Sequence, residues 1–284
     1  MKTLLKNILM PAYKQIKSFY LRCQQGQVSN NSKSGDKNGF IYIVTGDSYA
    51  KECLLSIKSL KKYNIEKICV FSQEKYRKMF EVECDYFFSI NSKLLRPKVE
   101  YISQTPFKNT VYLDSDTFIN ENISDLFKLL NKYDFGGVFC NSRKRENYSK
   151  LISKYSDIPY SFSEINTGVM VFNSSNAVKK LFKSWHKYYY KYISKTNGWD
   201  QPSFRVALWE SEVKLCHLPP EYNVRPKSVS IKVEKNKNIL GHLHMKPRIY
   251  HMHYSPNVHK GEFNIKNIKD LREKLKPLSI PLTY

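Results

Sequence analysis

Two carboxylates one residue apart, Asp114 and Asp116, are the side chains best placed for chemistry in this 284-residue chain. They follow residues 111–113, an apolar run typical of a short buried strand. At the carboxyl edge of a parallel sheet, where α/β proteins bind their ligands, the two side chains can converge on one hard cation such as Mg²⁺ or Mn²⁺. Such an ion could hold a diphosphate and neutralise its charge as it leaves. An Asp-x-Asp after a strand is also a common solvated turn, so the interpretation depends on the rest of the chain.

A group of histidines near the end of the sequence offers further ligands. Five of the seven histidines fall within eighteen residues, at positions 242, 244, 251, 253 and 259. Residues 249–254 alternate in the manner of a strand, so His251 and His253 share one face. Histidines on a strand are often surface residues, but this crowding favours a role in binding an anion or a metal.

The elements that must position these groups alternate between strand and helix. Apolar runs typical of strands occupy residues 40–44, 68–71, 86–88, 111–113, 135–140 and 166–173. Helical spacing of apolar residues follows the first run over 54–60, follows Asp116 over 123–130, and is strongest over 178–192. This order predicts an α/β fold, a Rossmann-like sheet flanked by helices. No glycine-rich phosphate-binding motif follows the first strand, so a nucleotide would have to be held by other means.

Two further segments have both a structural and a functional interpretation. Residues 141–163, which carry three basic residues in a row and little periodicity, predict a mobile loop over the site. Asp200 comes at the beginning of an expected helix, where a carboxylate is favourable, so it is either a helix cap or a residue of the site.

Composition limits the partners and the compartment. The formal net charge is +22, from 47 Lys and Arg against 25 Asp and Glu. Such a charge suits nucleotides, acidic glycans, lipid head groups or nucleic acid, although a general bias toward Lys explains it equally well. The six cysteines show no paired spacing, which favours a reducing compartment and argues against a zinc site. We therefore expect a cytoplasmic protein, and no apolar run approaches the length of about 20 residues that a membrane span needs.

The two ends of the chain differ from its centre. Residues 1–38 combine helical apolar spacing with basic residues, which predicts an amphipathic arm and linker that either lies on an anionic membrane or packs on a protein surface. We expect one catalytic domain over residues 39–262 and a C-terminal tail over 263–284.

The order and spacing of the motifs, taken together, are more specific than any one of them. They are the first strand with Thr45-Gly46, residues 56–60, Lys98 ahead of Thr105-Pro106-Phe107, residues 112–117, residues 166–173, Asp200-Gln201, residues 218–223 and the terminal His253-Tyr254. From about residue 40 to 260 the chain resembles the GT-A nucleotide-diphospho-sugar glycosyltransferases, and among them the glycogenin-like family eight. The resemblance implies a GT-A fold, with a mixed sheet flanked by helices in a single catalytic domain.

The resemblance also implies roles for individual residues. Asp114 and Asp116 match the family's metal-binding Asp-x-Asp, and His253 matches the histidine that completes the metal shell. Asn166, Asp200 and Gln201 match positions around the reacting sugar. The residues implied to contact the donor are Thr45, Gly46, Tyr49, Lys98, Asp114, Ser115, Gly168, His259 and Lys260.

The tail departs from the family pattern. The family continues from its histidine through a glycine to Lys-Pro-Trp, whereas residues 255–261 here read Ser-Pro-Asn-Val-His-Lys-Gly. This leaves open the choice between His251 and His253 as ligand, and between His259 and Lys260 on the diphosphate.

We therefore expect a Mn²⁺- or Mg²⁺-dependent hexosyltransferase. It would move a sugar from a nucleotide-sugar, expected to be a UDP-sugar, to a hydroxyl of a glycan, glycolipid or protein, with retention of the anomeric configuration. One alternative is a phosphatase of the haloacid-dehalogenase type, but its motif needs Thr or Val where this chain has Phe118. The other is a nucleic-acid-binding protein, which would leave the two aspartates and the histidines without a role.

Overall fold

The structure is a computed structural model that describes residues 36–92, 96–140, 142–225 and 247–251. The chain divides into two units, residues 1–35 and 36–284, and every described residue belongs to the second. The amphipathic arm, the C-terminal tail, and His253, His259 and Lys260 lie outside the described residues, so the predictions made for them remain predictions.

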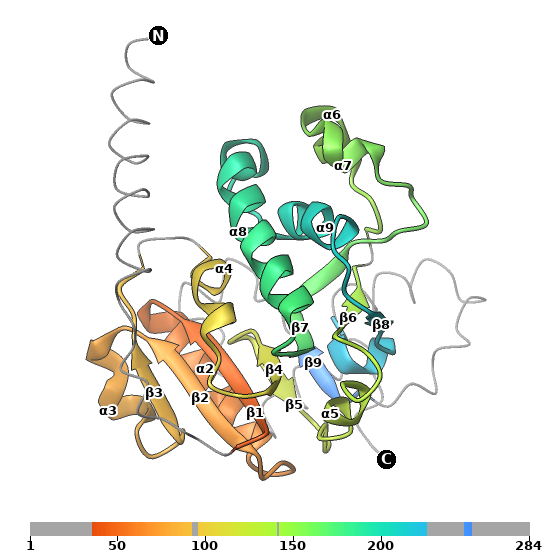
Figure 1. Ribbon diagram of the computed structural model, residues 1–284. Coiled ribbons are helices and arrows are strands. Elements are labelled where there is room, and N and C mark those ends of the chain that lie inside the picture. The colour runs from red at the N-terminus through yellow and green to blue at the C-terminus, as the bar shows by residue number, and fades with distance from the viewer. Residues whose placement is uncertain (1–35, 93–95, 141, 226–246, 252–284) are drawn as a thin grey trace, which may run out of the picture. The chain divides into compact units, whose positions relative to one another are not determined.

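A mixed sheet forms the centre of the described part (Figure 1). Its seven strands, in chain order, are β1 (Asn38–Val44), β2 (Lys67–Ser72), β3 (Tyr86–Ser89), β4 (Asn109–Leu113), β6 (Phe135–Phe139), β7 (Ile165–Asn173) and β8 (Leu215–His217). They lie in the order β3-β2-β1-β4-β7-β6-β8. The first four strands are parallel, and β7 runs antiparallel to both β4 and β6. The mixed sheet expected from the sequence is confirmed.

A small second sheet pairs β5 (Thr117–Ile119) with β9 (Ile249–His251). The pairing is antiparallel and sets Thr117 opposite His251. Because β5 begins directly after Asp116, this register brings the last described residue of the chain beside the Asp-x-Asp turn.

Helices cover both faces of the large sheet (Figure 1). They are α2 (Asp47–Leu60), α3 (Arg77–Phe80), α4 (Lys98–Tyr101), α5 (Leu126–Leu129), α6 (Glu146–Leu151), α7 (Ser153–Asp157), α8 (Asn176–Thr196) and α9 (Gln201–Trp209), with short 3₁₀ turns η1 (Glu74–Tyr76), η2 (Ile102–Gln104) and η3 (Pro220–Asn223). Alternate residues of β1 enter different cores, since Phe40 and Tyr42 pack with α2, and Ile41 and Ile43 pack on the side of α8 and α9. A strand buried on both faces explains the unbroken apolar run in the sequence.

The longest described helix, α8, buries the stripe that its sequence predicts. Its buried apolar residues are Val178, Leu181, Phe182, Trp185, Tyr188, Tyr189 and Tyr192. The Ser175 hydroxyl accepts a hydrogen bond from the Val178 amide at the N-terminal end, and the helix ends at Asn197 in the left-handed conformation. No described helix has the length and apolar character to span a membrane.

Residues 141–163 differ from the mobile loop expected from the sequence, because they contain the two short helices α6 and α7. Tyr148, Ile152 and Tyr155 are buried here and belong to the same hydrophobic core as α8 and α9. Their irregular spacing hides the apolar face from a search for periodicity, since each short helix contributes only one or two of these residues.

Candidate active site

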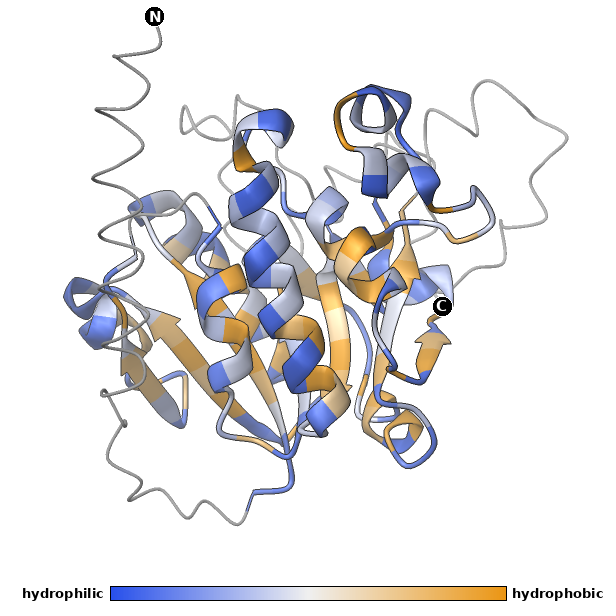
Figure 2. Ribbon diagram, turned by 45° about the horizontal axis from the view of Figure 1, so that its top comes forward, coloured by the Kyte–Doolittle hydropathy of each residue, from blue (hydrophilic) through white to orange (hydrophobic). Residues whose placement is uncertain are grey.

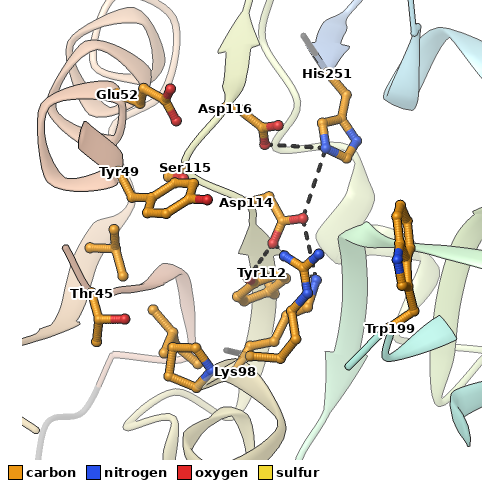
Figure 3. Close-up of a pocket in the computed structure, with 14 residues that line it drawn as sticks. Thr45, Tyr49, Glu52, Lys98, Tyr112, Asp114, Ser115, Asp116, Trp199 and His251 are labelled. Carbon is orange, nitrogen blue, oxygen red and sulfur yellow. Dashed lines mark hydrogen bonds and ion pairs between the residues drawn. The ribbon is translucent and has the colours of Figure 1, made fainter. Parts of the chain in front are cut away.

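The site lies in a pocket at the carboxyl ends of β1 and β4, bounded also by α2 and by the segment that precedes α9 (Figure 3). The residues lining it are Ile43, Val44, Thr45, Tyr49, Glu52, Arg96, Pro97, Lys98, Tyr112, Asp114, Ser115, Asp116, Trp199 and His251. Ligand binding at the carboxyl ends of parallel strands is the rule for open α/β sheets.

Asp114, Asp116 and His251 form a cluster in this pocket that could hold a metal ion. One ligand atom from each residue lies within 4.8 Å of the others. The His251 Nε2 atom is 3.2 Å from Asp116 Oδ1 and 3.8 Å from Asp114 Oδ2. Two carboxylate oxygens and one imidazole nitrogen form a donor set that suits Mn²⁺ or Mg²⁺.

A chain of hydrogen bonds fixes the orientation and tautomer of His251. The backbone N–H of Gly168 can only donate, and it donates to Asn166 Oδ1 at 2.9 Å. The Asn223 side-chain amide also donates to that oxygen, at 2.9 Å, so its own Oδ1 is left to face His251 Nδ1, again at 2.9 Å. Nδ1 therefore carries a proton, so in the neutral imidazole the lone pair lies on Nε2, the nitrogen that faces Asp116. This neutral tautomer is the form of histidine that binds a metal.

Gly168 leaves the space that the imidazole occupies. A Cβ atom at this position would lie 2.2 Å from Cε1 and 2.8 Å from Nδ1 of His251. The backbone of β7 and the histidine can therefore approach closely only because residue 168 has no side chain.

Lys98 joins Asp114 to Asp200 from beneath the pocket. Its side chain is only 6% exposed, and Nζ lies 3.1 Å from Asp114 Oδ1 and 3.3 Å from Asp200 Oδ2. The Thr167 carbonyl accepts a third contact from Nζ at 3.0 Å. The Tyr112 hydroxyl also donates to Asp114 Oδ1. Burial, and then the charge of Asp114, raise the pKa of Tyr112 well above its ordinary value, so this phenol stays a donor.

Asp200 is a buried charge and does not cap its helix. No hydrogen bond joins its carboxylate to the N-terminus of α9. Instead Oδ2 accepts from the Thr167 hydroxyl at 2.7 Å, and Oδ1 lies 3.6 Å from Arg96 Nε. Burial alone would raise the pKa of Asp200, but the charges of Lys98 and Arg96 and the hydroxyl bond hold it below its ordinary value. Asp200 is therefore ionised and balances the two cations.

The structure brings most of the sequence-predicted residues to one place. Thr45, Tyr49, Lys98, Asp114 and Ser115 line the pocket with Asp116. Gly46 shapes the turn after β1, with φ of 94°, and donates its N–H to the Gln73 side chain at 3.3 Å. The buried residues Asn166, Gly168, Asp200 and Gln201 are not among the described residues that line the pocket.

Three residues of the pocket that the sequence did not single out are Glu52, Arg96 and Trp199. Arg96 stands two residues before Lys98, and Trp199 directly before Asp200, so proximity to a predicted site residue was the available signal for both. Glu52 lies inside α2 with no such neighbour. Both of its carboxylate oxygens are buried and have no hydrogen-bond partner among the described residues. Burial, and then the charge of Asp116, raise the pKa of Glu52 to about 8.

Residues 106–263 match the family of nucleotide-diphospho-sugar transferases. The chain belongs to this family. The match spans the Asp-x-Asp, β7, Asp200 and His251, whereas β1, α2 and Lys98, which also bound the pocket, precede it. It confirms the resemblance drawn from the motifs and decides against a haloacid-dehalogenase phosphatase. No curated protein matches the sequence.

Similar solved structures are glycosyltransferases, and at these identities they support the fold alone. The galactosyltransferase LgtC, crystallised with donor and acceptor sugar analogs, is 13% identical, with a TM-score of 0.56 over 87% of this chain and 96% of that one. The glycosyltransferase GlyE of Streptococcus pneumoniae TIGR4 is 16% identical, with a TM-score of 0.58 over 87% of this chain and 63% of its own. The bifunctional glycosyltransferase WbbM is 15% identical, with a TM-score of 0.55 over 79% and 47%. The fold is GT-A.

Proposed function

We propose that the chain transfers a sugar from a UDP-sugar to an acceptor hydroxyl, with a divalent cation, Mn²⁺ or Mg²⁺, held by Asp114, Asp116 and His251. The observation that supports this most is the tautomer of His251. Its Nδ1 is committed to Asn223, and Nε2 faces the two carboxylates that the family uses for its metal. His253, the ligand implied by the resemblance, lies outside the described residues, so we assign the role to His251 on geometry.

The cation would supply charge to stabilise the departing nucleotide diphosphate. The chain's own residues hold its ligands in place. Lys98 and Tyr112 bind Asp114 from below, so its carboxylate cannot turn away from the pocket. Asn223 does the same for His251. Ligands held in this way cost little to reorganise when charge develops.

Arg96 and Tyr49 line two further sides of the pocket in which the sugar donor would bind. The Arg96 side chain is 36% exposed, lines the pocket and keeps its guanidinium near Asp200, so it can meet the anionic or hydroxyl groups of a nucleotide-sugar. Tyr49 is 43% exposed and stands at the other wall beside Thr45, where its ring offers a face for a nucleobase (Figure 3).

Retention of configuration is the stereochemistry that we propose. An inverting enzyme needs a general base on the side of the sugar opposite the leaving group. The carboxylates that line the described pocket are Glu52, Asp114 and Asp116, and all belong to the side where the diphosphate would bind. The opposite side presents Trp199, with Asp200 buried behind it in ion pairs. This arrangement supports a same-face attack in which Asp200 stabilises charge.

The acceptor and the cellular compartment are also part of the proposal. We propose a glycan, glycolipid or protein hydroxyl as acceptor, and a reducing compartment such as the cytoplasm. Five cysteines, Cys53, Cys69, Cys84, Cys140 and Cys216, are free in the described part of the chain, which supports that compartment.

Hydrolysis of nucleotide-sugars in the absence of acceptor tests the proposal. A panel of UDP-, GDP- and CDP-sugars is incubated with the protein and Mn²⁺, with and without a chelator, and release of nucleoside diphosphate is measured. We expect release from a UDP-sugar, dependent on Mn²⁺ and lost in Asp116→Asn. Asp157→Asn, at an exposed acid, is the matched control and should retain activity. Release that is unaffected by chelator, or equal in Asp116→Asn, would contradict the metal assignment.

A further inference from the structure

The outward face of α8 carries a charge that the site does not use. Six of its 21 residues are lysines and none is Asp or Glu. All six lysines, Lys179, Lys180, Lys183, Lys187, Lys191 and Lys195, are exposed. Figure 2 shows the corresponding hydrophilic positions along the helix.

The spacing gathers these lysines into one stripe. From Lys180 onward they recur every three or four residues, which is the period of a helix face. The run from Lys180 to Lys195 extends for about 22 Å along the helix axis. Like charges three or four residues apart destabilise a helix, so the stripe opposes the stability of the element that carries it.

Few acids in the neighbourhood offset the stripe. Glu210, directly after α9, is paired with Lys154 and accepts from the Tyr188 hydroxyl at 2.5 Å, and its charge also interacts with that of Lys187. Glu100 accepts from the Tyr190 hydroxyl at 2.9 Å, at the edge of the stripe, since Tyr190 lies seven residues after Lys183. Within the stripe itself, Lys195 donates to the Leu151 carbonyl at 3.0 Å, while Lys187 and Lys191 lie over tyrosine rings.

Exposed apolar and aromatic side chains adjoin the C-terminal half of α8. Leu151 is 50% exposed, and its carbonyl is the one that Lys195 contacts. Trp209 is 48% exposed, directly precedes Glu210 and packs its ring 5.0 Å from that of Phe162. Tyr160, two residues before Phe162, is 66% exposed. Exposed Trp, Tyr and Leu beside a row of lysines are the combination that binds at a membrane interface.

We propose that the lysine stripe of α8, together with Leu151, Tyr160 and Trp209, forms a surface that docks on an anionic lipid bilayer. The ammonium groups meet the lipid phosphates, and the three exposed side chains enter the interface. Nucleic acid would also attract the lysines, but it gives the aliphatic Leu151 no partner. The inference does not rest on the proposed function, because none of these residues lines the pocket.

Docking through α8 would also bring the bilayer near the pocket. The chain runs from Lys195 through the left-handed residues Asn197 and Gly198 to Trp199, which lines the pocket. A glycan carried on a lipid would thus arrive at the side away from the proposed cation ligands.

The test compares vesicle binding of the full chain with that of two charge-matched variants. One carries Lys183→Gln, Lys187→Gln and Lys191→Gln in the stripe. The other carries Lys78→Gln, Lys128→Gln and Lys132→Gln, exposed lysines of α3 and of the α5 region. Co-sedimentation is measured with vesicles of phosphatidylcholine and phosphatidylglycerol in a two-to-one ratio, and with phosphatidylcholine alone.

We expect the stripe variant to bind the anionic vesicles roughly 100-fold more weakly, at about a fivefold loss per lysine, and the control variant to lose much less. Binding should fall as salt is added and be negligible on neutral vesicles. Trp209→Ser should weaken binding to the same vesicles while leaving the net charge unchanged. Melting temperature and Mn²⁺-dependent UDP binding, measured on every variant, report separately on the fold and on the proposed function.

Equal loss in the two lysine variants would overturn the proposal, because it would show that total charge, wherever it lies, governs binding. It would be overturned equally if the stripe variant lost affinity for double-stranded DNA while its vesicle binding stayed intact, since the face would then be a nucleic-acid surface. Lack of any binding of the parent chain to anionic vesicles would also refute it.

Discussion

Gly168 shows how one missing side chain can shape a candidate metal site. It has no role in chemistry, yet it donates to the asparagine that begins the hydrogen-bond chain to His251 and leaves room for the imidazole. Its φ is not in the left-handed region, so the requirement for glycine comes from the close approach of the histidine and not from backbone strain.

Gly168→Ala should therefore displace His251 without unfolding the protein. The new Cβ would lie 2.2 Å from the ring, and the ring must move by more than the tolerance of a metal site. We expect Mn²⁺ affinity, measured by calorimetry, to fall by roughly 10- to 100-fold. Gly137→Ala is not a suitable control, because its Cβ would meet Ile165 at 2.4 Å. Ser115→Ala, in the pocket but outside the ligand set, is a better one and should keep Mn²⁺ affinity.

The two candidate histidines can be compared directly. The family resemblance points to His253, whereas the described geometry places His251 Nε2 at 3.2 Å from Asp116. We expect His251→Ala to weaken Mn²⁺ binding more than His253→Ala does. Calorimetry of both variants with Mn²⁺ and UDP measures the difference. A greater loss from the His253 variant would return the ligand role to that residue.

We expect Glu52 to make the stability of the protein depend on pH. Its carboxyl has a pKa of about 8 in the folded protein, against an ordinary value of 4.5. Between these values the folded protein keeps a proton that the unfolded chain releases, so stability is greatest below the lower value and falls as pH rises toward the upper one. Glu52→Gln cannot ionise and should remove this fall. We expect it to be more stable than the parent by roughly 1–3 kcal/mol at pH 8, and equal to it at pH 4.

Thermal unfolding in a chelating buffer at both pH values gives the comparison, and it keeps cations out of the site. Glu81→Gln, at an exposed acid, should change neither value. A Glu52→Gln protein that is no more stable than the parent at pH 8 would show that the side chain finds a partner in solution.

At the scale of residues, the sequence could predict groups that are neighbours along the chain but not contacts between residues far apart in it. Asp114 and Asp116 are adjacent to one strand and could be found as a pair. Asn223 is 28 positions from His251 and 57 positions from Asn166 in the sequence, so the chain of hydrogen bonds is visible only in the fold. Glu52 is one charged residue on a helix, and the sequence does not show which surface that helix packs against, so its burial could not be predicted.

At the scale of elements, the turn between α8 and α9 holds the buried charges of the site in register. The Trp185 indole of α8 donates to the Asp200 carbonyl at 3.2 Å, and the Ser203 hydroxyl of α9 donates to the same carbonyl at 2.7 Å. The carboxylate of Asp200 is thereby directed away from the helix end and toward Lys98 and Arg96.

Asp200→Asn should keep the Thr167 hydrogen bond but leave Lys98 and Arg96 with one counter-charge fewer. We expect turnover to fall by about 100-fold or more, as for lost transition-state electrostatics, with little change in donor affinity. Ser203→Ala removes a hydrogen bond at the same turn, keeps the carboxylate and should retain near-normal turnover. NMR of the product linkage tests the stereochemistry in the same assay, and an inverted anomeric centre would refute retention. Near-normal turnover of Asp200→Asn would reduce Asp200 to a structural role.

Elements were predictable in proportion to the regularity of their burial. Strands β1 and β4 are buried on both faces and give unbroken apolar runs, and α8 buries one full stripe. The segment of α6 and α7 was expected as a loop, because helices of six and five residues are too short to show a helical period. The pairing of β5 with β9 joins segments more than a hundred residues apart and leaves no local signal.

At the scale of the whole molecule, positive charge is distributed over the chain. Residues 1–35 contain six basic residues and no acidic one, so residues 36–284 still carry a formal net charge of +16 out of +22. An arm that adds affinity for anionic membranes would therefore act together with the body, and neither alone would account for binding.

Removal of residues 1–35 separates the contribution of the arm from that of residues 36–284. Both hydrophobic clusters lie within the described residues, from Phe40 to Ile249, and the pocket residues do as well. A chain beginning at Asp36 should therefore keep the melting temperature and the Mn²⁺-dependent UDP affinity of the full chain. Co-sedimentation with anionic vesicles should be weaker than for the full chain, because six charges are lost. It should not vanish, because the lysines of α8 remain. Equal binding of the two chains would leave the arm with another purpose, and a large fall in melting temperature would show that it packs on the body.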